Sequence, residues 1–241
     1  MELIVVADPE TLAESIADRI AATIASAPAT VLGVATGSSP LGVYRALARR
    51  VAGGLDVANL RAFALDEYVG ISPDDPRSYA ATLHTAFARP LGLSPSALHV
   101  PDGTRPDLDE ACADYERAIA DAGGVDIQLA GFGANGHLAF NEPGSPADSV
   151  TRVVDLAART RSDNARFFDH PDEVPHQAIT QGVGTILRAR SIIAVATGSA
   201  KAEAVAAAVA GPIDAACPAS FLRLHEDAVV YADPAAAALL P

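Results

Sequence analysis

The sequence predicts an α/β protein in which helices cover both faces of a doubly wound, mostly parallel sheet. Short apolar runs typical of buried strands alternate along the chain with longer amphipathic or alanine-rich segments that favour helices. Several of these runs end in glycine or serine just before a helical segment, which is typical of a turn from strand to helix. Because parallel strands are joined by right-handed crossovers through helices, the alternation predicts one sheet with helices on both sides.

Length and composition favour one domain over residues 1–241. Half of the 241 residues are apolar, and no stretch reads as a linker. No apolar run approaches the roughly 20 residues of a membrane span, and the start of the chain lacks the basic region of a secretion signal. Cys112 and Cys217 lie far apart without metal-binding spacing. We therefore expect a reduced, cytoplasmic protein that uses neither a membrane nor a metal ion.

The formal net charge is −13, and only one of the 17 basic residues is a lysine, Lys201. A field of this sign disfavours nucleic acid and anionic membranes as partners. An anionic small substrate needs local cations and helix N-termini to overcome it. Lys201 is a candidate ligand for such an anion, although chance explains a lone lysine equally well.

The N-terminal segment reads as a strand followed by an amphipathic helix. Residues 3–7 are a short apolar run, and Asp8 and Pro9 supply an N-cap and a first helical position. The helix is expected to run to about Ala27, and Pro28 ends it. Its apolar residues recur at every fourth position: Leu12, Ile16, Ile20 and Ile24.

A second strand, residues 30–36, ends in Gly37, Ser38 and Ser39, and a helix is expected at 41–52. Free backbone N–H groups, the positive end of a helix dipole and two hydroxyls converge there, which favours a phosphate site. The turn has neither the lysine of a Walker motif nor a GxGxxG pattern. An ordinary turn capped by Ser39 is an equally good interpretation.

A third strand, at about residues 61–65, delivers two adjacent carboxylates, Asp66 and Glu67, at its carboxyl end. Neighbouring side chains on an extended backbone point in opposite directions, so only one of them can face a given pocket. We favour Asp66 as the functional group and Glu67 as structural, while two solvated carboxylates remain the simpler alternative.

The alternation continues with a helix at 78–88, a short strand at 97–100 and a helix at 108–122. An apolar strand, residues 125–131, then leads into the loop 131–145, GFGANGHLAFNEPGS. This loop combines glycines with Asn135, His137 and Glu142. A carboxylate beside an imidazole orients the ring and raises its basicity, as general base chemistry requires. A glycine-rich turn with solvated side chains is the alternative.

The last third of the chain begins with a strand at 149–157. Residues 158–177 are polar, broken by prolines and rich in arginine, which favours a lid over a site. Residues 191–198 repeat the apolar strand ending in Ala-Thr-Gly seen at 30–37, and Lys201 follows at the start of a helix at 199–211. The remaining predictions are a turn and short helix at 178–189, a helical turn at 220–225, a strand at 228–232 and a closing helix in the alanine-rich tail.

Nearly the whole chain resembles the glucosamine-6-phosphate deaminase (isomerase) family. The matching stretches are VATGSSPLGVYRAL, ALDEYVGI, GFGANGHLAFNEPGS, NARFFD, ITQGVGTIL and ATGSAKAEAV. The related 6-phosphogluconolactonases share a similar glycine-histidine loop but lack its Asn-Glu-Pro step, so Glu142 favours the deaminases. The resemblance implies a Rossmann-like fold that converts glucosamine 6-phosphate and water into fructose 6-phosphate and ammonia without a cofactor.

The resemblance also implies roles for the candidate residues. His137, oriented by Glu142 with Asn135 beside it, would open the sugar ring, and Asp66 would move a proton from C2 to C1. The phosphate would lie on one set of groups: Gly37, Ser38, Ser39, Arg166 and Lys201. A guanidinium and an ammonium complement each other as phosphate ligands.

The sequence departs from the family pattern in three places. Asn135 stands where members often have aspartate, so we expect a less strongly charged His137 but retained activity. Pro146 and Val154 replace a serine and a basic residue that bind N-acetylglucosamine 6-phosphate in activated members, although Arg152 is present. We therefore expect no activation by that ligand. The third departure is a C-terminal segment shorter than in those members, and we expect a monomer or a small homo-oligomer.

Two other functions stay open at this point. A 6-phosphogluconolactonase-like hydrolase would need no base for C2, so an Asp66→Asn variant would keep its activity. A sugar-phosphate sensor would need the phosphate site but not the three catalytic groups together, and it usually carries a DNA-binding segment, of which the sequence shows no sign.

Overall fold

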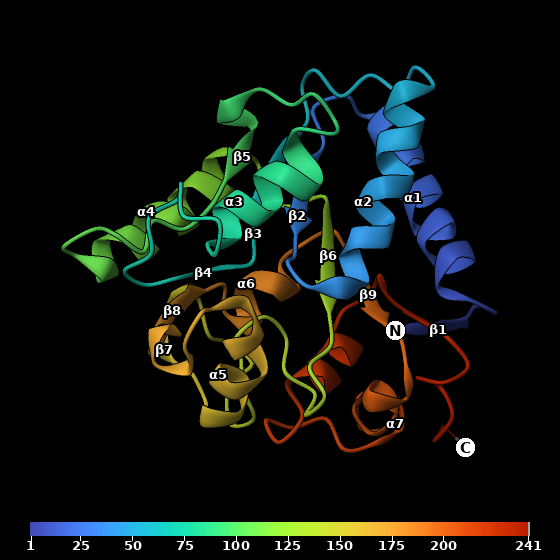
Figure 1. Ribbon diagram of the computed structural model, residues 1–241. Helices are drawn as coiled ribbons and strands as arrows, with labels where there is room; N and C mark the ends of the chain where they lie inside the picture. The colour runs from blue at the N-terminus through green and yellow to red at the C-terminus, as the bar shows by residue number, and fades with distance from the viewer. Residues whose placement is uncertain (241) are drawn as a thin grey trace.

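The computed structural model describes residues 1–240, and its centre is a seven-stranded sheet (Figure 1). All neighbouring strands in this sheet are parallel, which confirms the predicted fold class. The strands, in their order across the sheet, are β1 (Glu2–Val5), β10 (Ala228–Ala232), β9 (Ser191–Ala196), β6 (Ile127–Gly131), β2 (Val31–Val34), β3 (Arg61–Ala64) and β5 (Leu98–His99).

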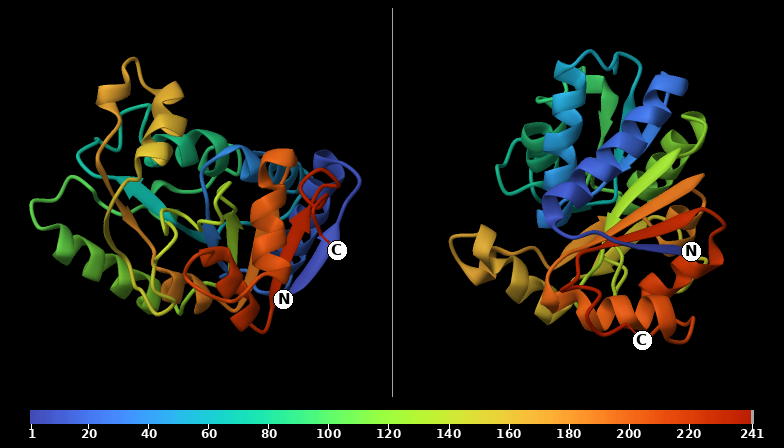
Figure 2. Two further views of the ribbon diagram at one scale, coloured as in Figure 1. Left: turned by 90° about the horizontal axis from the view of Figure 1, so that it is seen from below. Right: turned by 90° about the vertical axis from the view of Figure 1, so that its right-hand side faces the viewer.

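Helices cover both faces of the sheet, so that the strands are buried on both sides (Figure 2). One face packs against α1 (Pro9–Ser26), α2 (Ser38–Ala52) and η1 (His84–Ala88), which continues α3 (Tyr79–Leu83) as a single π-helical turn. The other face packs against α4 (Leu108–Asp121), α6 (Val183–Leu187), α7 (Ala202–Ala210) and the 3-10 segment η6 (Pro218–Leu224).

The first helix forms as its sequence predicts. The Asp8 carboxylate accepts hydrogen bonds from the backbone N–H groups of Glu10 and Thr11 at 3.0 and 2.9 Å, so that it caps α1. The predicted apolar stripe is completely buried against the sheet: Leu12, Ile16, Ile20 and Ile24. Burial of each such side chain contributes roughly 1.5–3 kcal/mol.

The chain reverses its direction of travel across the sheet between β2 and β6. From β2 the chain proceeds through β3 to β5 on one side, and from β6 it proceeds through β9 to β10 on the other. In open parallel sheets, the carboxyl ends of the two strands at such a switch point flank a crevice where ligands bind. The two segments singled out in the sequence, after β2 and after β6, therefore lie next to each other.

A second, antiparallel sheet of three strands was not predicted. It consists of β4 (Asp66–Tyr68), β8 (Gln177–Thr180) and β7 (Arg152–Asp155), with β8 in the middle. The sequence placed β8 in a turn with a short helix, because four residues without alternation carry no periodic signal. Pairing with strands on both sides makes this segment extended.

Other differences concern the ends of elements. Residues 158–177 contain α5 (Ala158–Asn164) and the 3-10 turns η3 (Ala165–Phe167) and η4 (Pro171–Glu173), and they project from the body of the molecule (Figure 2). A 3-10 turn, η5 (Ser199–Lys201), precedes α7, and another, η2 (Pro95–Ala97), precedes β5. The predicted closing helix is wrong, because residues 234–239 form turns, and such a short segment does not offset the cost of starting a helix.

Within residues 1–240, no helix is both long and apolar enough to cross a membrane.

Candidate functional site

Three adjacent strands, β2, β6 and β9, end at the same edge of the sheet. After β2 and β9 the chain turns at Gly37 and Gly198, whose φ values of +105° and +85° favour glycine. In both turns a serine follows the glycine at the start of a helical segment, so backbone N–H groups at the helix N-termini point towards this edge. Gly37 and Ser38 are exposed and Ser39 is half-buried, which leaves them accessible to a ligand.

The loop after β6 lies between these two turns and folds tightly on itself. The Gly133 N–H donates to the His137 carbonyl at 3.0 Å, and a Cβ atom at position 133 would lie 2.3 Å from the His137 ring. Ala139 has a φ of +52°, which costs a non-glycine residue about 1–2 kcal/mol. The backbone therefore holds His137 in place at the expense of local strain.

Glu142 is the centre of the contacts in this loop. One carboxylate oxygen accepts a hydrogen bond from the Asn135 amide at 2.7 Å. The other accepts one from the Thr160 hydroxyl of α5 and lies 3.7 Å from Nδ1 of His137. Burial alone would raise the pKa of Glu142, but the His137 ring, the Thr160 hydroxyl and the Asn135 amide outweigh it and lower this pKa to about 2.

The contact between His137 and Glu142 is not a hydrogen bond, because the 3.7 Å between Nδ1 and the carboxylate oxygen exceeds hydrogen-bond distance. Nδ1 of His137 is buried and has no hydrogen-bond partner among residues 1–240. A small movement of the Glu142 carboxylate towards the ring would supply that partner. The sequence predicted that these two side chains lie close together, and in the structure they are 3.7 Å apart.

Asp66 lies on β4, opposite Thr180 of β8, and its side chain is buried. No group of residues 1–240 donates a hydrogen bond to its carboxylate. Burial in this environment, together with the charge of Glu67, raises the pKa of Asp66 to about 8. A buried carboxylate of this kind is a strong proton acceptor once it is ionised.

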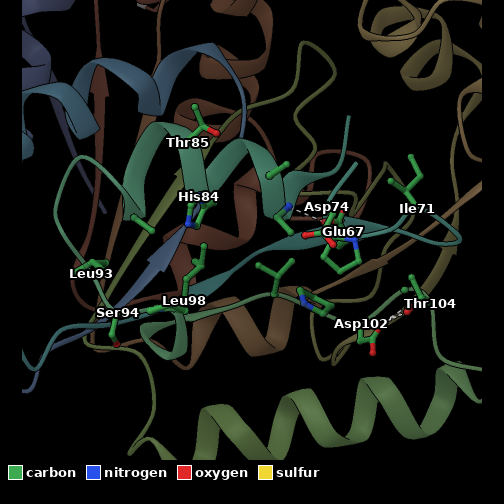
Figure 3. Close-up of a pocket in the computed structure, with 18 residues that line it drawn as sticks. Glu67, Ile71, Asp74, His84, Thr85, Leu93, Ser94, Leu98, Asp102 and Thr104 are labelled. Atoms are coloured by element: carbon green, nitrogen blue, oxygen red, sulfur yellow. Dashed lines mark hydrogen bonds between the residues drawn. The ribbon is translucent and has the colours of Figure 1, made fainter. Parts of the chain in front are cut away.

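Glu67 has different surroundings, as the alternation along the strand predicted. Its carboxylate accepts backbone hydrogen bonds from Tyr68, Tyr79 and Ala80 at 2.8, 2.9 and 2.8 Å, at the start of α3. Glu67 also lines a cavity of about 600 Å³, together with His84 and Thr85 (Figure 3). None of the predicted site residues lines this cavity, so its size does not identify the site.

The unpredicted strand β8 joins Asp66 to the His137 loop. The Thr180 hydroxyl accepts a hydrogen bond from the Phe140 N–H at 3.2 Å. The Gln181 carbonyl accepts one from the Asn141 side chain at 2.8 Å, and the Gln181 N–H donates to the Leu65 carbonyl at 2.8 Å. The end of β8 is thus hydrogen-bonded both to the residue before Asp66 and to the loop that carries His137.

The cations come together from two separate segments. Burial lowers the pKa of Lys201, the charge of Asp163 opposes this shift, and the charges of Arg159 and Arg166 add to it. Arg166 is exposed, and its guanidinium lies 4.7 Å over the Phe167 ring. Arg159 was not among the predicted phosphate ligands. The only sequence signal for it was the enrichment of arginine in residues 158–177.

Arg152 contacts the same loop, and two of the other histidines, His99 and His225, pack within the fold. Arg152 donates to the Asn141 side chain at 2.9 Å and to the Ser145 hydroxyl at 3.3 Å. His99 stacks on Phe63 with 4.4 Å between ring centroids, and His225 contacts the Ala189 carbonyl at 2.7 Å. Among residues 1–240 no three His, Cys, Asp or Glu side chains gather as metal ligands would.

Comparison with known proteins shows the family to which the chain belongs. The sequence profile of glucosamine-6-phosphate isomerases/6-phosphogluconolactonase matches residues 7–231. The chain is 53% identical to a glucosamine-6-phosphate deaminase of Cutibacterium acnes, over 100% of this chain and 92% of that protein. It is 50% identical to one of Streptomyces avermitilis, over 100% and 93% of the two chains.

Solved structures give the same result. A monomeric glucosamine-6-phosphate deaminase superimposes with a TM-score of 0.96 at 41% identity, covering 99% of this chain and 100% of the other. A 6-phosphogluconolactonase from Trypanosoma brucei superimposes with a TM-score of 0.79 at 22% identity, over 100% and 98% of the two chains, and it shares the fold. The chain therefore belongs to the family of glucosamine-6-phosphate isomerases and 6-phosphogluconolactonases.

Proposed function

We propose that this protein is a glucosamine-6-phosphate deaminase, which converts glucosamine 6-phosphate and water into fructose 6-phosphate and ammonia. The observation that carries the proposal is Asp66, a buried carboxylate without a hydrogen-bond donor, on the strand that β8 joins to the His137 loop. The relatives with about half of their residues identical carry this name. The lactonase structures, at about one fifth identity, support the fold alone.

The proposed steps move protons and add water, so they call on no cofactor. His137, with Glu142 and Asn135 beside it, takes the proton of the C1 hydroxyl and delivers one to the ring oxygen, which opens the ring. The ionised Asp66 removes the C2 proton of the open-chain aldehyde. The C2–H electron pair forms the C1–C2 double bond, the π pair of C1=O moves to O1, and O1 takes a proton from the C2 ammonium, which gives a neutral enolamine. Asp66 returns its proton to C1 while the nitrogen lone pair forms the C2=N bond of an iminium. Water adds to C2 and passes a proton to the nitrogen, and the C2–N bond then breaks to release ammonia and leave the C2 carbonyl.

The phosphate of the substrate would bind where the two turns and the cations meet. The backbone N–H groups of the segment Gly37, Ser38 and Ser39 offer a helix N-terminus, and Arg166 and Lys201 offer positive charge. Burial is the main cause that lowers the pKa of Lys201, and the charges of Arg159 and Arg166 add to it while that of Asp163 opposes it. An anion would relieve the repulsion between these cations, in spite of the overall charge of −13.

We also infer that the chain works as one domain, with residues 158–177 as a lid, and as a monomer in the cytoplasm. The structural match to a monomeric glucosamine-6-phosphate deaminase supports the monomer. The two cysteines are buried free thiols, which a reducing compartment preserves. Light scattering in solution tests the oligomeric state, because a monomer has the mass of one chain at every concentration.

Regulation follows from the same residues. Arg152 already donates to Asn141 and Ser145, and Val154 beside it brings no charge. We therefore expect kinetics that N-acetylglucosamine 6-phosphate does not activate. Sigmoidal kinetics that become hyperbolic when this ligand is added would contradict the expectation.

The deciding experiment follows ammonia and fructose 6-phosphate in parallel during turnover of glucosamine 6-phosphate. Equal yields of the two products support the deaminase. The same preparation is offered 6-phosphogluconolactone, and the Asp66→Asn variant is compared on both substrates. A lactonase keeps its activity in this variant, whereas a deaminase loses it. Tight binding without any turnover by the unmodified protein would favour a sensor.

A further inference from the structure

We propose that Thr160 is a positioning residue that makes the His137–Glu142 pair depend on occupation of the phosphate site. The inference rests on the proposed function, and it adds a route by which the distant phosphate influences ring opening. The Thr160 hydroxyl donates to the Glu142 oxygen that also lies 3.7 Å from Nδ1 of His137. Glu142 is therefore shared between the catalytic loop and α5.

The two oxygens of Glu142 are held in different ways. One is held by Asn135, which belongs to the same loop and moves with it. The other is held by Thr160, which comes from a separate helix. Thr160 is the one buried residue of the seven in α5, so the hydrogen bond forms only when this helix lies against the loop.

The same helix carries part of the cationic surface. Arg159 directly precedes Thr160, and Arg166 follows α5 within η3. Both lie close enough to Lys201, which belongs to a separate segment, for their charges to act on it. Without an anion, the charges of Arg159 and Arg166 act unfavourably on Lys201, whereas that of Asp163 acts favourably. A phosphate dianion attracts all three cations and so favours the position of α5 in which Thr160 contacts Glu142.

The position of α5 then determines how Glu142 meets His137. When α5 is in place, Thr160 fixes the oxygen of Glu142 that faces the imidazole. When α5 moves away, this oxygen loses its donor and the carboxylate is free to rotate towards water. A substrate that carries a phosphate thus completes the orientation of the group that opens its ring, whereas a neutral sugar does not.

The test uses two substitutions at one position and a control on the same helix. Thr160→Val removes the hydroxyl at nearly constant volume, and Thr160→Ser restores it. Ser162→Ala changes an exposed hydroxyl of α5. We expect Thr160→Val to lower kcat by about 10- to 100-fold with KM changed less than about threefold. Thr160→Ser is expected to recover most of the loss, and Ser162→Ala to stay near the unmodified protein.

A second measurement needs no turnover and separates this inference from the proposed function. The ring resonances of His137, assigned by comparison with His137→Gln, are followed by NMR at fixed pH while inorganic phosphate is added. We expect phosphate to shift them in the unmodified protein and in Thr160→Ser, but not in Thr160→Val. Calorimetry with inorganic phosphate checks that all three proteins still bind the anion.

Several outcomes would overturn the inference. If added phosphate does not shift the His137 resonances of the unmodified protein, the phosphate site and His137 are not coupled. A Thr160→Val variant with unchanged kcat, or with an equal response to phosphate, leaves no role for the hydroxyl. A Thr160→Val variant in which KM rises and kcat is unchanged would place Thr160 in substrate binding instead. If the unmodified protein makes no ammonia but phosphate still shifts His137 through Thr160, the proposed function fails and the coupling stands.

Discussion

Asp66 and Glu67 are consecutive residues of β4, and both side chains are buried, at 6% and 3% exposure. Glu67 accepts three backbone hydrogen bonds at the start of α3, whereas Asp66 accepts none from residues 1–240. Burial raises the pKa of both, but for Glu67 the hydrogen bonds oppose this shift. The comparison shows how one strand carries a carboxylate held by backbone hydrogen bonds on one side and a carboxylate without a donor on the other.

The largest expected effect separates the two carboxylates by activity. Asp66→Asn keeps the shape of the side chain but removes the proton acceptor, so kcat should fall by about 10²–10⁴-fold. Glu67→Gln should retain far more of the activity, because Glu67 touches no reacting atom in the proposed mechanism. Steady-state rates of ammonia release measure both. Equal losses in the two variants would erase the distinction.

Stability should change in the opposite direction. In Glu67→Gln, the new NH₂ group faces a backbone N–H donor and cannot accept its hydrogen bond. The free energy of unfolding should therefore fall by about 1–3 kcal/mol. Asp66→Asn should raise this free energy at pH 9, by about 1.4 kcal/mol for each unit by which the pKa of Asp66 is raised in the folded state. Urea unfolding of the three proteins at the same pH measures these differences. A destabilised Asp66→Asn would show that Asp66 is structural as well.

The pH dependence sharpens the same point. The folded protein holds a proton on Asp66 above the pH at which the unfolded chain releases it, since the pKa is raised to about 8. The stabilising effect of Asp66→Asn should therefore be absent below about pH 4 and grow as pH rises towards 8. For catalysis, kcat/KM should fall as pH drops below about 8, because the protonated form cannot accept the C2 proton.

Glu67→Gln refines this prediction. It removes the neighbouring charge that helps to raise the pKa of Asp66. The acid limb of kcat/KM should therefore move to lower pH, by less than the shift that burial alone causes. An acid limb that stays in place would mean that the two carboxylates do not interact.

The smallest expected effect concerns a carboxylate that this protein lacks. Asn135→Asp would place a second acid beside Glu142, 2.7 Å from its oxygen in the present arrangement. The added charge should favour the protonated form of His137 and move the limb that reports on this ring to higher pH, with modest change in kcat. A profile identical to that of the unmodified protein would exclude coupling between residue 135 and His137.

Much of the fold could be predicted because its signals are local. The stripe of α1 and its Asp8 cap, the Gly37 and Gly198 turns and the loop around His137 are each visible within a few consecutive residues. The alternation of an extended chain also predicted that Asp66 and Glu67 have different surroundings, although it did not by itself choose between them. Apolar strands that end together at one edge of a parallel sheet then brought the candidate residues into one region.

The rest depended on contacts between distant parts of the chain. Strand β8 is extended because β4 and β7 pair with it, and no pattern in Gln177–Thr180 announces this. The alanine-rich tail has helical composition but forms turns. No sequence signal distinguishes Thr160 within its polar segment, and only the fold brings its hydroxyl into contact with Glu142, 18 residues away. Arg159 is likewise identified as a candidate site residue only because its charge acts on Lys201 in the folded protein.

The sequence by itself therefore determined the doubly wound sheet and the family, and it supplied the candidate site residues, because periodicity, caps and motifs act over short distances. Tertiary structure alone decided that Asp66 is buried without a donor and that Glu67 is satisfied by backbone hydrogen bonds. It also decided that α5 reaches the loop that carries His137 and Glu142. Burial and pairing depend on which segments meet, and they set the pKa values on which the proposed chemistry depends.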